Sequence, residues 1–386
     1  MGKVKELFGK IHLWLGLVSG AVVFLVSVTG CLYVFEEEIR SFQYQDRYEL
    51  GHIPDSQKLS VGTLSEIVFK SAVGAEVKKI DWYPEANRNY TVHLEEGRRA
   101  YINPYDGNMS DVHDPDWLWY VEKLHTSLLL GEFGKWVIRI NILVFLILLL
   151  TGIYLWWPAK KARRKQAFSL KTNGSFKRLN YDLHSVLGFY GLLVLLVITL
   201  TGMWWSFDWY KQTVFGLLGE KYEKPNPVMI DDLNSSLDWK NKQVLDEVFE
   251  TSMLRYPGAK TAHIEKGKNI GLASRIRLEY PSGLYKKRNE IFYHPAKGEI
   301  VETRLYKDYT AGEIYKHANY EIHTGRGFGI LGKIIAFMAS LLAASLPVSG
   351  FYIWYGRTYK KRKKLPTSKA REGLRIVINK LELANE

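Results

Sequence analysis

Four long apolar blocks constrain the fold of this chain more than any other feature. They comprise residues 11–35, 137–157, 186–207 and 330–355. Each contains at least 21 residues and almost no charge, and roughly 20 apolar residues allow a helix to cross a bilayer core. Buried helices of a soluble protein are the alternative, but aromatic residues at the ends of four such blocks favour membrane spans. We therefore predict four transmembrane helices.

The basic residues are concentrated beside these blocks. The net charge is +13, from 53 Lys and Arg against 40 Asp and Glu. Residues 1–11 carry +2 and residues 158–184 and 356–386 carry +7 each, whereas residues 36–136 carry −7. Short basic segments stay in the cytoplasm, so we expect cytoplasmic termini and two large outer segments, as in a multi-pass protein of the bacterial inner membrane. Contact with lipid headgroups then explains the basic excess without nucleic-acid binding.

The first block is expected to remain in the protein rather than act as a cleaved signal peptide. It is longer than the apolar region of a signal peptide, and it ends at Phe35 followed by three glutamates without a small-residue cleavage site.

The two halves of the chain resemble each other. One set of matching positions lies at an offset of 172 residues and a second set at an offset of 198 residues. Each half therefore contains a span that leaves the cytoplasm and a span that returns, in the same order, which is a parallel repeat. The matches are His12 with His184, Thr29-Gly30 with Thr201-Gly202, His125 with His323, and Thr151-Gly152 with Ser349-Gly350.

The segments between the spans predict small α+β modules. In the first, a helix over 60–74 precedes strands at 77–84, 89–95 and 99–104, with a turn and a short last strand. In the second, a helix over 241–256 precedes strands at 260–266, 273–280 and 289–295. The predicted divisions are 1–35 (N-terminus and first span), 36–123 (first outer module), 124–157 (interfacial segment and second span), 158–183 (basic loop), 184–207 (third span), 208–321 (second outer module), 322–355 (interfacial segment and fourth span) and 356–386 (basic tail).

Four of the ten histidines survive in the repeat. His12 and His184 lie at the cytoplasmic starts of their spans, whereas His125 and His323 lie just outside the membrane. An imidazole in a membrane protein is costly without a partner or ligand, and two neutral imidazoles can bind haem iron from both sides. We therefore predict one haem b between His12 and His184 and another between His125 and His323, with these four side chains as axial iron ligands.

Several neighbouring features enter this hypothesis. Gly16 and Gly188 follow their histidines by one helical turn, where a missing Cβ would let a flat macrocycle approach. The Thr-Gly dipeptides are interpreted as helix-packing positions. The acidic, aromatic stretch 111–120 is a weaker candidate for the substrate pocket, its alternative being an interfacial anchor. The only cysteine, Cys31, excludes a Cys-rich metal site and covalent haem attachment.

Other roles for the four histidines stay open at this point. They could cap helices, contact lipid headgroups, relay protons or bind a non-haem metal, although no His-x-x-x-His or carboxylate-rich helical motif supports the last.

Taken together, these motifs resemble the PepSY-associated transmembrane family. The motifs are HLWLGLVSG, LHTSLLLGEFG with TGIYLWWP, HSVLGFYG and IHTGRGFGILG, and the outer modules are similar to PepSY domains. The resemblance implies an inner-membrane oxidoreductase with two b-type haems that reduces ferric siderophore iron. Because the chain has no Gly-x-Gly-x-x-Gly turn on a strand–helix unit, a separate cytoplasmic reductase or a quinol is expected as the electron donor.

Two other functions compete with this reading. A membrane-anchored PepSY regulatory protein would bind an envelope protease or another protein without redox chemistry. A proton-coupled transporter is the weakest alternative, because the spans lack acidic residues at mid-depth. In the favoured reading the two haems lie near opposite membrane faces, separated by roughly the bilayer core, and the acceptor docks at the outer modules.

Overall fold

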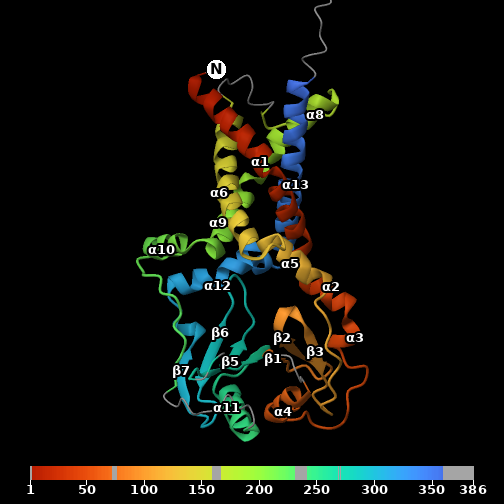
Figure 1. Ribbon diagram of the computed structural model, residues 1–386, viewed down its shortest axis with the longest axis vertical. Coiled ribbons are helices and arrows are strands. Elements are labelled where there is room, and N and C mark those ends of the chain that lie inside the picture. Colours follow the sequence, from red (N-terminus) through yellow and green to blue (C-terminus); the bar gives the residue numbers. More distant parts are fainter. Residues whose placement is uncertain are drawn as a thin grey trace, which may run out of the picture. The chain divides into compact units, whose positions relative to one another are not determined.

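The computed structural model describes residues 2–71, 76–158, 167–230, 241–267, 269 and 271–359. Within them, four long apolar helices are candidate membrane spans, as predicted (Figure 1). Large apolar side chains such as Val18, Leu193 and Leu331 are exposed on them, as expected where lipid surrounds a helix. The spans are α1 (Lys3–Tyr33), α6 (Gly131–Trp156), the succession of α8 (Phe176–Asp182), the π-helical η3 (Leu183–Leu187) and α9 (Gly188–Ser206), and α13 (Gly329–Thr358), which follows η5 (Arg326–Phe328).

The chain divides into two compact units. Unit 1 contains the described parts of 1–28, 140–196 and 339–386, and unit 2 contains 29–139 and 197–338. Unit 1 therefore consists of portions of the four long helices and their connections. Its packing includes a stack of Trp156 on Phe189, with ring centres 3.7 Å apart.

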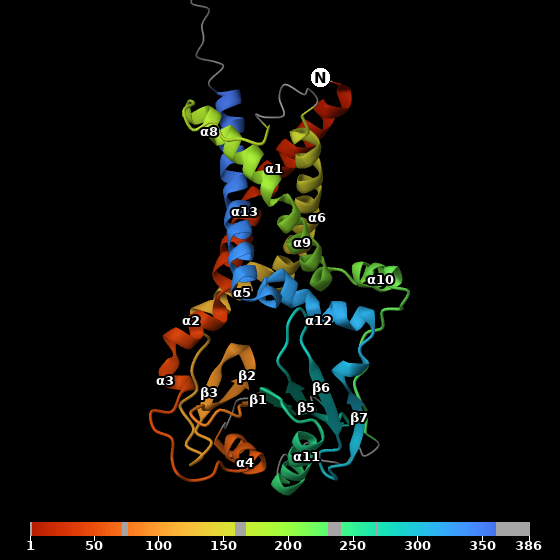
Figure 2. The same cartoon turned by 180° about the vertical axis from the view of Figure 1, so that it is seen from behind.

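Unit 2 contains one antiparallel sheet of seven strands in the order β3-β2-β1-β4-β5-β6-β7 (Figure 2). All strands predicted from alternating hydropathy are present within a few residues of their expected positions. In place of the expected short strand after the turn, the described residues form isolated bridges. The strands are β1 (Val77–Trp82), β2 (Tyr90–Leu94), β3 (Arg99–Ile102), β4 (Thr261–Glu265), β5 (Ser274–Glu279), β6 (Arg288–Tyr293) and β7 (Ile300–Arg304).

Two helices, α4 (Val61–Ser71) and α11 (Lys242–Arg255), cover one face of this sheet. Apolar residues from alternate strand positions form two core clusters beneath them, one in each half of the sheet. The helices meet at Gly62, whose backbone N–H donates to Asp246 at 2.6 Å. A Cβ at Gly62 would lie 2.2 Å from the Lys242 carbonyl oxygen, so only glycine permits this approach.

Pairing of β1 with β4 joins the two predicted modules into this single sheet. Asp81 lies opposite His263, and Ile80 lies opposite Ile264. The strands come from segments separated by two spans, so their pairing is a tertiary contact that neither module predicts alone.

Shorter helices complete unit 2. They include α5 and α12, which carry the second histidine pair. The remaining bounds are α2 (Glu36–Gln43), α3 (Gln45–Tyr48), η1 (Glu95–Gly97), α5 (Trp117–Ser127), α10 (Asp208–Leu217), η4 (Tyr306–Asp308) and α12 (Ala311–His323). Residues 72–75 of the first predicted module helix, residues 159–166 of the basic loop and residues 360–386 of the basic tail lie outside the described residues.

Candidate functional site

The four predicted histidines are distributed between the two units. His12 lies in α1 and His184 lies in η3, both in unit 1. His125 lies in the last turn of α5 and His323 is the last residue of α12, both in unit 2. The π-helical turn at His184 interrupts a regular helix, and such turns occur frequently at functional sites.

In each unit the histidine from one half of the repeat faces the histidine from the other half. The ring centres of His12 and His184 are 6.4 Å apart and their planes are inclined by 89°. The ring centres of His125 and His323 are 6.3 Å apart with an inclination of 71°. The predicted pairing is therefore present in the geometry, although the identity of any bound group is a separate question.

A hydroxyl group faces Nδ1 of every one of these rings. His12 Nδ1 is 2.9 Å from Thr151 Oγ1, and His184 Nδ1 is 2.8 Å from Ser349 Oγ. In unit 2 the corresponding distances are 3.3 Å from His125 Nδ1 to Thr29 Oγ1 and 2.9 Å from His323 Nδ1 to Thr201 Oγ1. In each half of the repeat, the first span carries the hydroxyl that contacts the second histidine, and the second span carries the hydroxyl that contacts the first histidine. Each half therefore orients its own two histidines.

The hydroxyl protons determine which ring nitrogen is free. Thr151 donates to the Ile147 carbonyl at 2.7 Å, and Ser349 donates to the Ser345 carbonyl at 2.9 Å. Thr201 likewise donates to the Val197 carbonyl at 2.8 Å. A hydroxyl has a single proton, so at these three positions its oxygen accepts from the Nδ1–H of the imidazole. Nε2 then carries the lone pair that a metal ion would use.

The glycine after each of three hydroxyl residues makes room for a histidine ring. A Cβ would lie 3.4 Å from His12 Cε1 at Gly152, 3.3 Å from His184 Cε1 at Gly350, and 3.6 Å from His323 Cε1 at Gly202. These dipeptides therefore are packing positions, and the side chains packed against their glycines are the histidine rings. The dipeptide recurs in all four spans, at the end opposite the histidine of that span. This recurrence was the sequence signal that could have indicated contact with a histidine.

Gly16 and Gly188 have less demanding surroundings. A Cβ at Gly16 would lie 3.8 Å from Leu148, and one at Gly188 would lie 3.6 Å from Leu346. These are ordinary contacts, so protein packing does not require glycine at either position. Their role beside a flat macrocycle stays a prediction.

The ring separations fit two ligands on opposite sides of one metal ion. Imidazole nitrogen binds an ion such as zinc at about 2.0–2.1 Å, and the ring centre lies about 1.1 Å further away, so opposed ligands have ring centres about 6.3 Å apart. Both pairs match this value. No group of three or more His, Cys, Asp or Glu among the described residues could hold a metal ion. Two imidazoles leave the other coordination positions of such an ion to water or to a prosthetic group such as a porphyrin.

A second histidine cluster, not singled out in the sequence, lies where β1 pairs with β4. The buried carboxylate of Asp81 is 2.7 Å from His93 Nε2 and 2.6 Å from His263 Nδ1. It also receives the ammonium of Lys79 at 2.9 Å. Because both ring nitrogens point directly at the carboxylate, this cluster joins the strands rather than forming a cage for a metal.

The pKa shifts in this cluster follow from burial and charge. Burial opposes ionisation of Asp81, but His93 and His263 lower its pKa well below the usual range. Burial also disfavours imidazolium at His263, yet hydrogen bonds to Asp81 and Glu279 raise its pKa. For His93, burial outweighs the attraction of Asp81 and lowers the pKa.

The stretch 111–120 has structural contacts of its own. Asp116 caps α5 by accepting from the Trp119 N–H at 2.9 Å, and it pairs with Arg40 at 2.7 Å. Trp117 donates to Gln43 at 2.9 Å. These contacts hold α5 and α2 together, and the alternative of an interfacial membrane anchor stays a prediction. They do not test the substrate-pocket prediction.

Fold and site together define a multi-pass membrane protein with four candidate spans and an α+β extramembrane part, in which histidines are paired across an internal repeat. Comparison with protein families identifies the chain as a member of the PepSY-associated TM region family, whose model matches residues 10–357. This confirms the resemblance seen in the sequence motifs. A search of curated proteins returned no significant match.

Proposed function

We propose that this chain is a transmembrane electron-transfer protein of the bacterial inner membrane that holds two b-type haems. His12 and His184 would bind one haem, and His125 and His323 would bind the other. The observation that carries the proposal is the opposed geometry of both pairs, with ring centres 6.4 and 6.3 Å apart. The hydroxyl partners support it further, since they engage Nδ1 and leave the Nε2 lone pair available to a metal ion.

Haem iron, when bound, supplies a one-electron couple between Fe(III) and Fe(II). The protein residues hold the imidazoles in one tautomer and orientation through Thr and Ser hydroxyls, and the apolar helices exclude water. Neutral hydroxyl partners add no charge beside the ligand, unlike a carboxylate partner. The predicted topology places the second pair on the outer side, where the electron would leave for an extracytoplasmic acceptor, with ferric siderophore iron as the acceptor we favour.

The deciding experiment is a haem count on the purified full-length protein. We expect a Soret band and a pyridine haemochrome of haem b, with two haems per chain. Reduction by a quinol or a cytoplasmic flavoprotein reductase, followed by reoxidation with an Fe(III) chelate, would then establish direction.

A protein without a Soret band after expression with adequate haem would overturn the proposal. Tight binding of an envelope protein by such a haem-free chain would instead support the regulatory alternative.

A further inference from the structure

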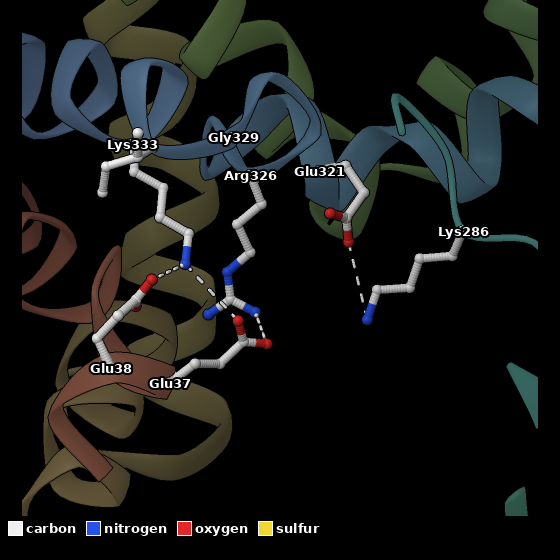
Figure 3. Close-up of a pocket in the computed structure, with 8 residues that line it drawn as sticks. Glu37, Glu38, Lys286, Glu321, Arg326, Gly329 and Lys333 are labelled. Atoms are coloured by element: carbon white, nitrogen blue, oxygen red, sulfur yellow. Dashed lines mark hydrogen bonds and ion pairs between the residues drawn. The ribbon is translucent and has the colours of Figure 1, made fainter. Parts of the chain in front are cut away.

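Unit 2 contains a cavity of about 360 Å³ next to the helix that ends at His323 (Figure 3). This volume is at the lower end of the range for small-molecule sites, about 300–1,000 Å³. Five segments contribute to it: α2, the connection between β5 and β6, α12, η5 and the start of α13. The lining residues are Glu37, Glu38, Lys286, Glu321, Arg326, Gly329, Ile330 and Lys333.

One wall of the cavity is built from satisfied ion pairs. Arg326 donates to Glu37 at 2.8 Å and to Glu36 at 3.0 Å. Lys333 donates to Glu38 at 2.6 Å. The side chains of Arg326 and Lys333 are only 7% and 9% exposed. These pairs hold the first turn of α2, the helix that follows the first span, against η5 and the start of α13.

The lining also contains buried polar atoms without hydrogen bonds. Among the described residues, Glu321 Oε1 and Arg326 Nε are both buried and lack a hydrogen-bond partner. The Glu321 side chain is 10% exposed, and Lys286 Nζ lies 3.7 Å from its Oε1, too far for a hydrogen bond. Figure 3 shows the Glu321 and Lys286 side chains pointing toward each other. Because unsatisfied buried polar groups cost free energy, this arrangement points to a ligand that satisfies them.

The internal repeat does not explain these residues. At the offset of 198 residues, Glu321 corresponds to Lys123 and Arg326 corresponds to Leu128. At the offset of 172 residues, Glu37 corresponds to Trp209. Glu321, Arg326 and Glu37 are therefore specific to one half, whereas Lys333 recurs as Lys135 and the four histidines are common to both halves. A requirement of the shared fold would have appeared twice.

Aromatic rings connect the cavity to the second histidine pair. The guanidinium of Arg326 lies 5.2 Å from the Tyr320 ring centre, and Lys286 Nζ lies 5.6 Å from it. Tyr320 packs on Trp205 with ring centres 6.4 Å apart, and Trp205 packs on His323 at 5.2 Å. A contiguous chain of side chains thus runs from the cavity to the predicted haem ligand.

The charges of the lining describe the ligand. Three cationic and three carboxylate side chains line the cavity, so there is no net positive field to attract a polyanion. Two buried atoms of the lining remain without hydrogen bonds, the donor Arg326 Nε and the acceptor Glu321 Oε1, and the partly exposed ammonium of Lys286 lies beside the latter. The matching ligand is compact, rich in oxygen acceptors, low in net charge and able to donate a hydrogen bond.

We propose that this cavity is the docking site for a compact, oxygen-rich Fe(III) chelate of low net charge, coupled to the second histidine pair through Tyr320 and Trp205. The inference rests on the proposed function. His125 and His323 would hold a ferrous b-type haem as the one-electron donor, so that the docked Fe(III) would become Fe(II) while the haem iron would go from Fe(II) to Fe(III). The protein and the chelate form and break no covalent bond in this step.

Binding is tested without electron transfer by a redox-inert probe. Ga(III) tris(acetohydroxamate), which is neutral, is titrated into the full-length protein in detergent and followed by calorimetry. We expect saturable binding that weakens at least about tenfold in Glu321→Gln and in Lys286→Met, since each removes a hydrogen bond involving a charged group. The trianionic Ga(III) tris(catecholate) should bind at least about tenfold more weakly than the neutral probe.

The matched control is Lys135→Ala, the repeat counterpart of Lys333, which pairs with Glu132 on the surface. It should bind the neutral probe as the unaltered protein does. Lys286 lies in a connection between strands, so Lys286→Met tests the site even if Glu321→Gln fails to fold. Equal binding by Lys286→Met and the unaltered protein, or preference for the trianion, would overturn the cavity assignment.

Failure of this inference is distinguishable from failure of the proposed function. Probe binding to a protein that contains no haem would support the cavity as a binding site and contradict the electron-transfer function. If the protein reduced Fe(III) chelates in a haem-dependent way but Lys286→Met did not affect probe binding, the proposed function would stand. The assignment of the cavity as the docking site would be wrong. Trp205→Leu should slow chelate reduction while leaving affinity for the gallium probe unchanged, and a parallel loss of probe affinity would contradict the aromatic connection.

Discussion

The histidines of the helices and the histidines of the sheet face different partners. In the helices, Nδ1 of His12 or His323 meets a neutral hydroxyl. In the sheet, His93 and His263 both meet the carboxylate of Asp81. A hydroxyl orients the ring without adding charge and leaves the Nε2 lone pair available, with another imidazole ring nearby. A carboxylate attracts protons to the imidazoles. The hydrogen bonds of Asp81 to His93 and His263 hold the strands together.

The comparison teaches that histidine pairing alone does not indicate a prosthetic group. What matters is which nitrogen is already engaged and whether the other faces a second donor. By this criterion we propose the helix pairs as ligand sites and interpret the sheet cluster as a structural junction. The following predictions test that division.

The largest expected effect is on haem content. His12→Ala combined with His184→Ala should remove one of the two proposed haems, because it eliminates both axial ligands of one site. His93→Gln combined with His263→Gln should leave haem content unchanged. Pyridine haemochrome measured per chain decides the result, and equal haem loss in the two double variants would abolish the distinction.

Asp81→Asn tests whether the cluster of Asp81, His93 and His263 stabilises the sheet. Removing one partner of a buried charged cluster typically costs about 3–5 kcal/mol of unfolding free energy, and the Asp81 side chain is 8% exposed. We expect a markedly lower thermal unfolding temperature and faster amide exchange in β1 and β4, with the haem spectrum of the folded fraction retained. Lys70→Ala, which breaks an exposed pair with Glu66, is the control. An Asp81→Asn protein as stable as this control would show that the junction contributes little.

The hydroxyl groups should have an intermediate effect. Thr151→Val or Ser349→Ala removes the acceptor for a ligand's Nδ1–H, and such changes around metal ligands typically lower metal affinity about 10–100-fold. Haem should therefore transfer faster from these variants to apomyoglobin, with a shifted midpoint potential. Thr213→Val, at a hydroxyl that contacts only its own helix among the described residues, is the matched control. If neither the haem transfer rate nor the midpoint potential changed in Thr151→Val and Ser349→Ala, the hydroxyls would have only a packing role.

The smallest expected effect is a pH dependence confined to the sheet. His263 has a raised pKa, so its stabilising contribution is complete below about pH 6.5 and is lost as pH rises through its folded-state pKa. His93 has a lowered pKa, so its contribution is present above about pH 6.5 and is lost as pH falls through its folded-state pKa. Stability should therefore be greatest near neutral pH.

Thermal unfolding measured across the neutral range would resolve the two sides of this profile. His263→Gln should flatten the alkaline side and His93→Gln the acidic side. A profile that both substitutions leave unchanged would place the pH response elsewhere in the chain.

Local patterns in the sequence determined much of this protein. Hydropathy located the four spans, alternation located the strands, and the repeat selected four histidines among ten. These features are readable because a span or a strand depends on residues adjacent in the chain. The pairing of histidines across halves was also predictable, since a parallel repeat places equivalent residues at equivalent depth.

Only the tertiary structure decided which distant residues meet. The hydroxyl of Thr151 is 139 residues from His12, Asp81 is 182 residues from His263, and Glu38 is 295 residues from Lys333. Periodicity carries no information about contacts at such separations, because they depend on how completed helices and strands pack. The joining of the two modules into one sheet, the partner of each imidazole and the charged cavity all follow from that packing.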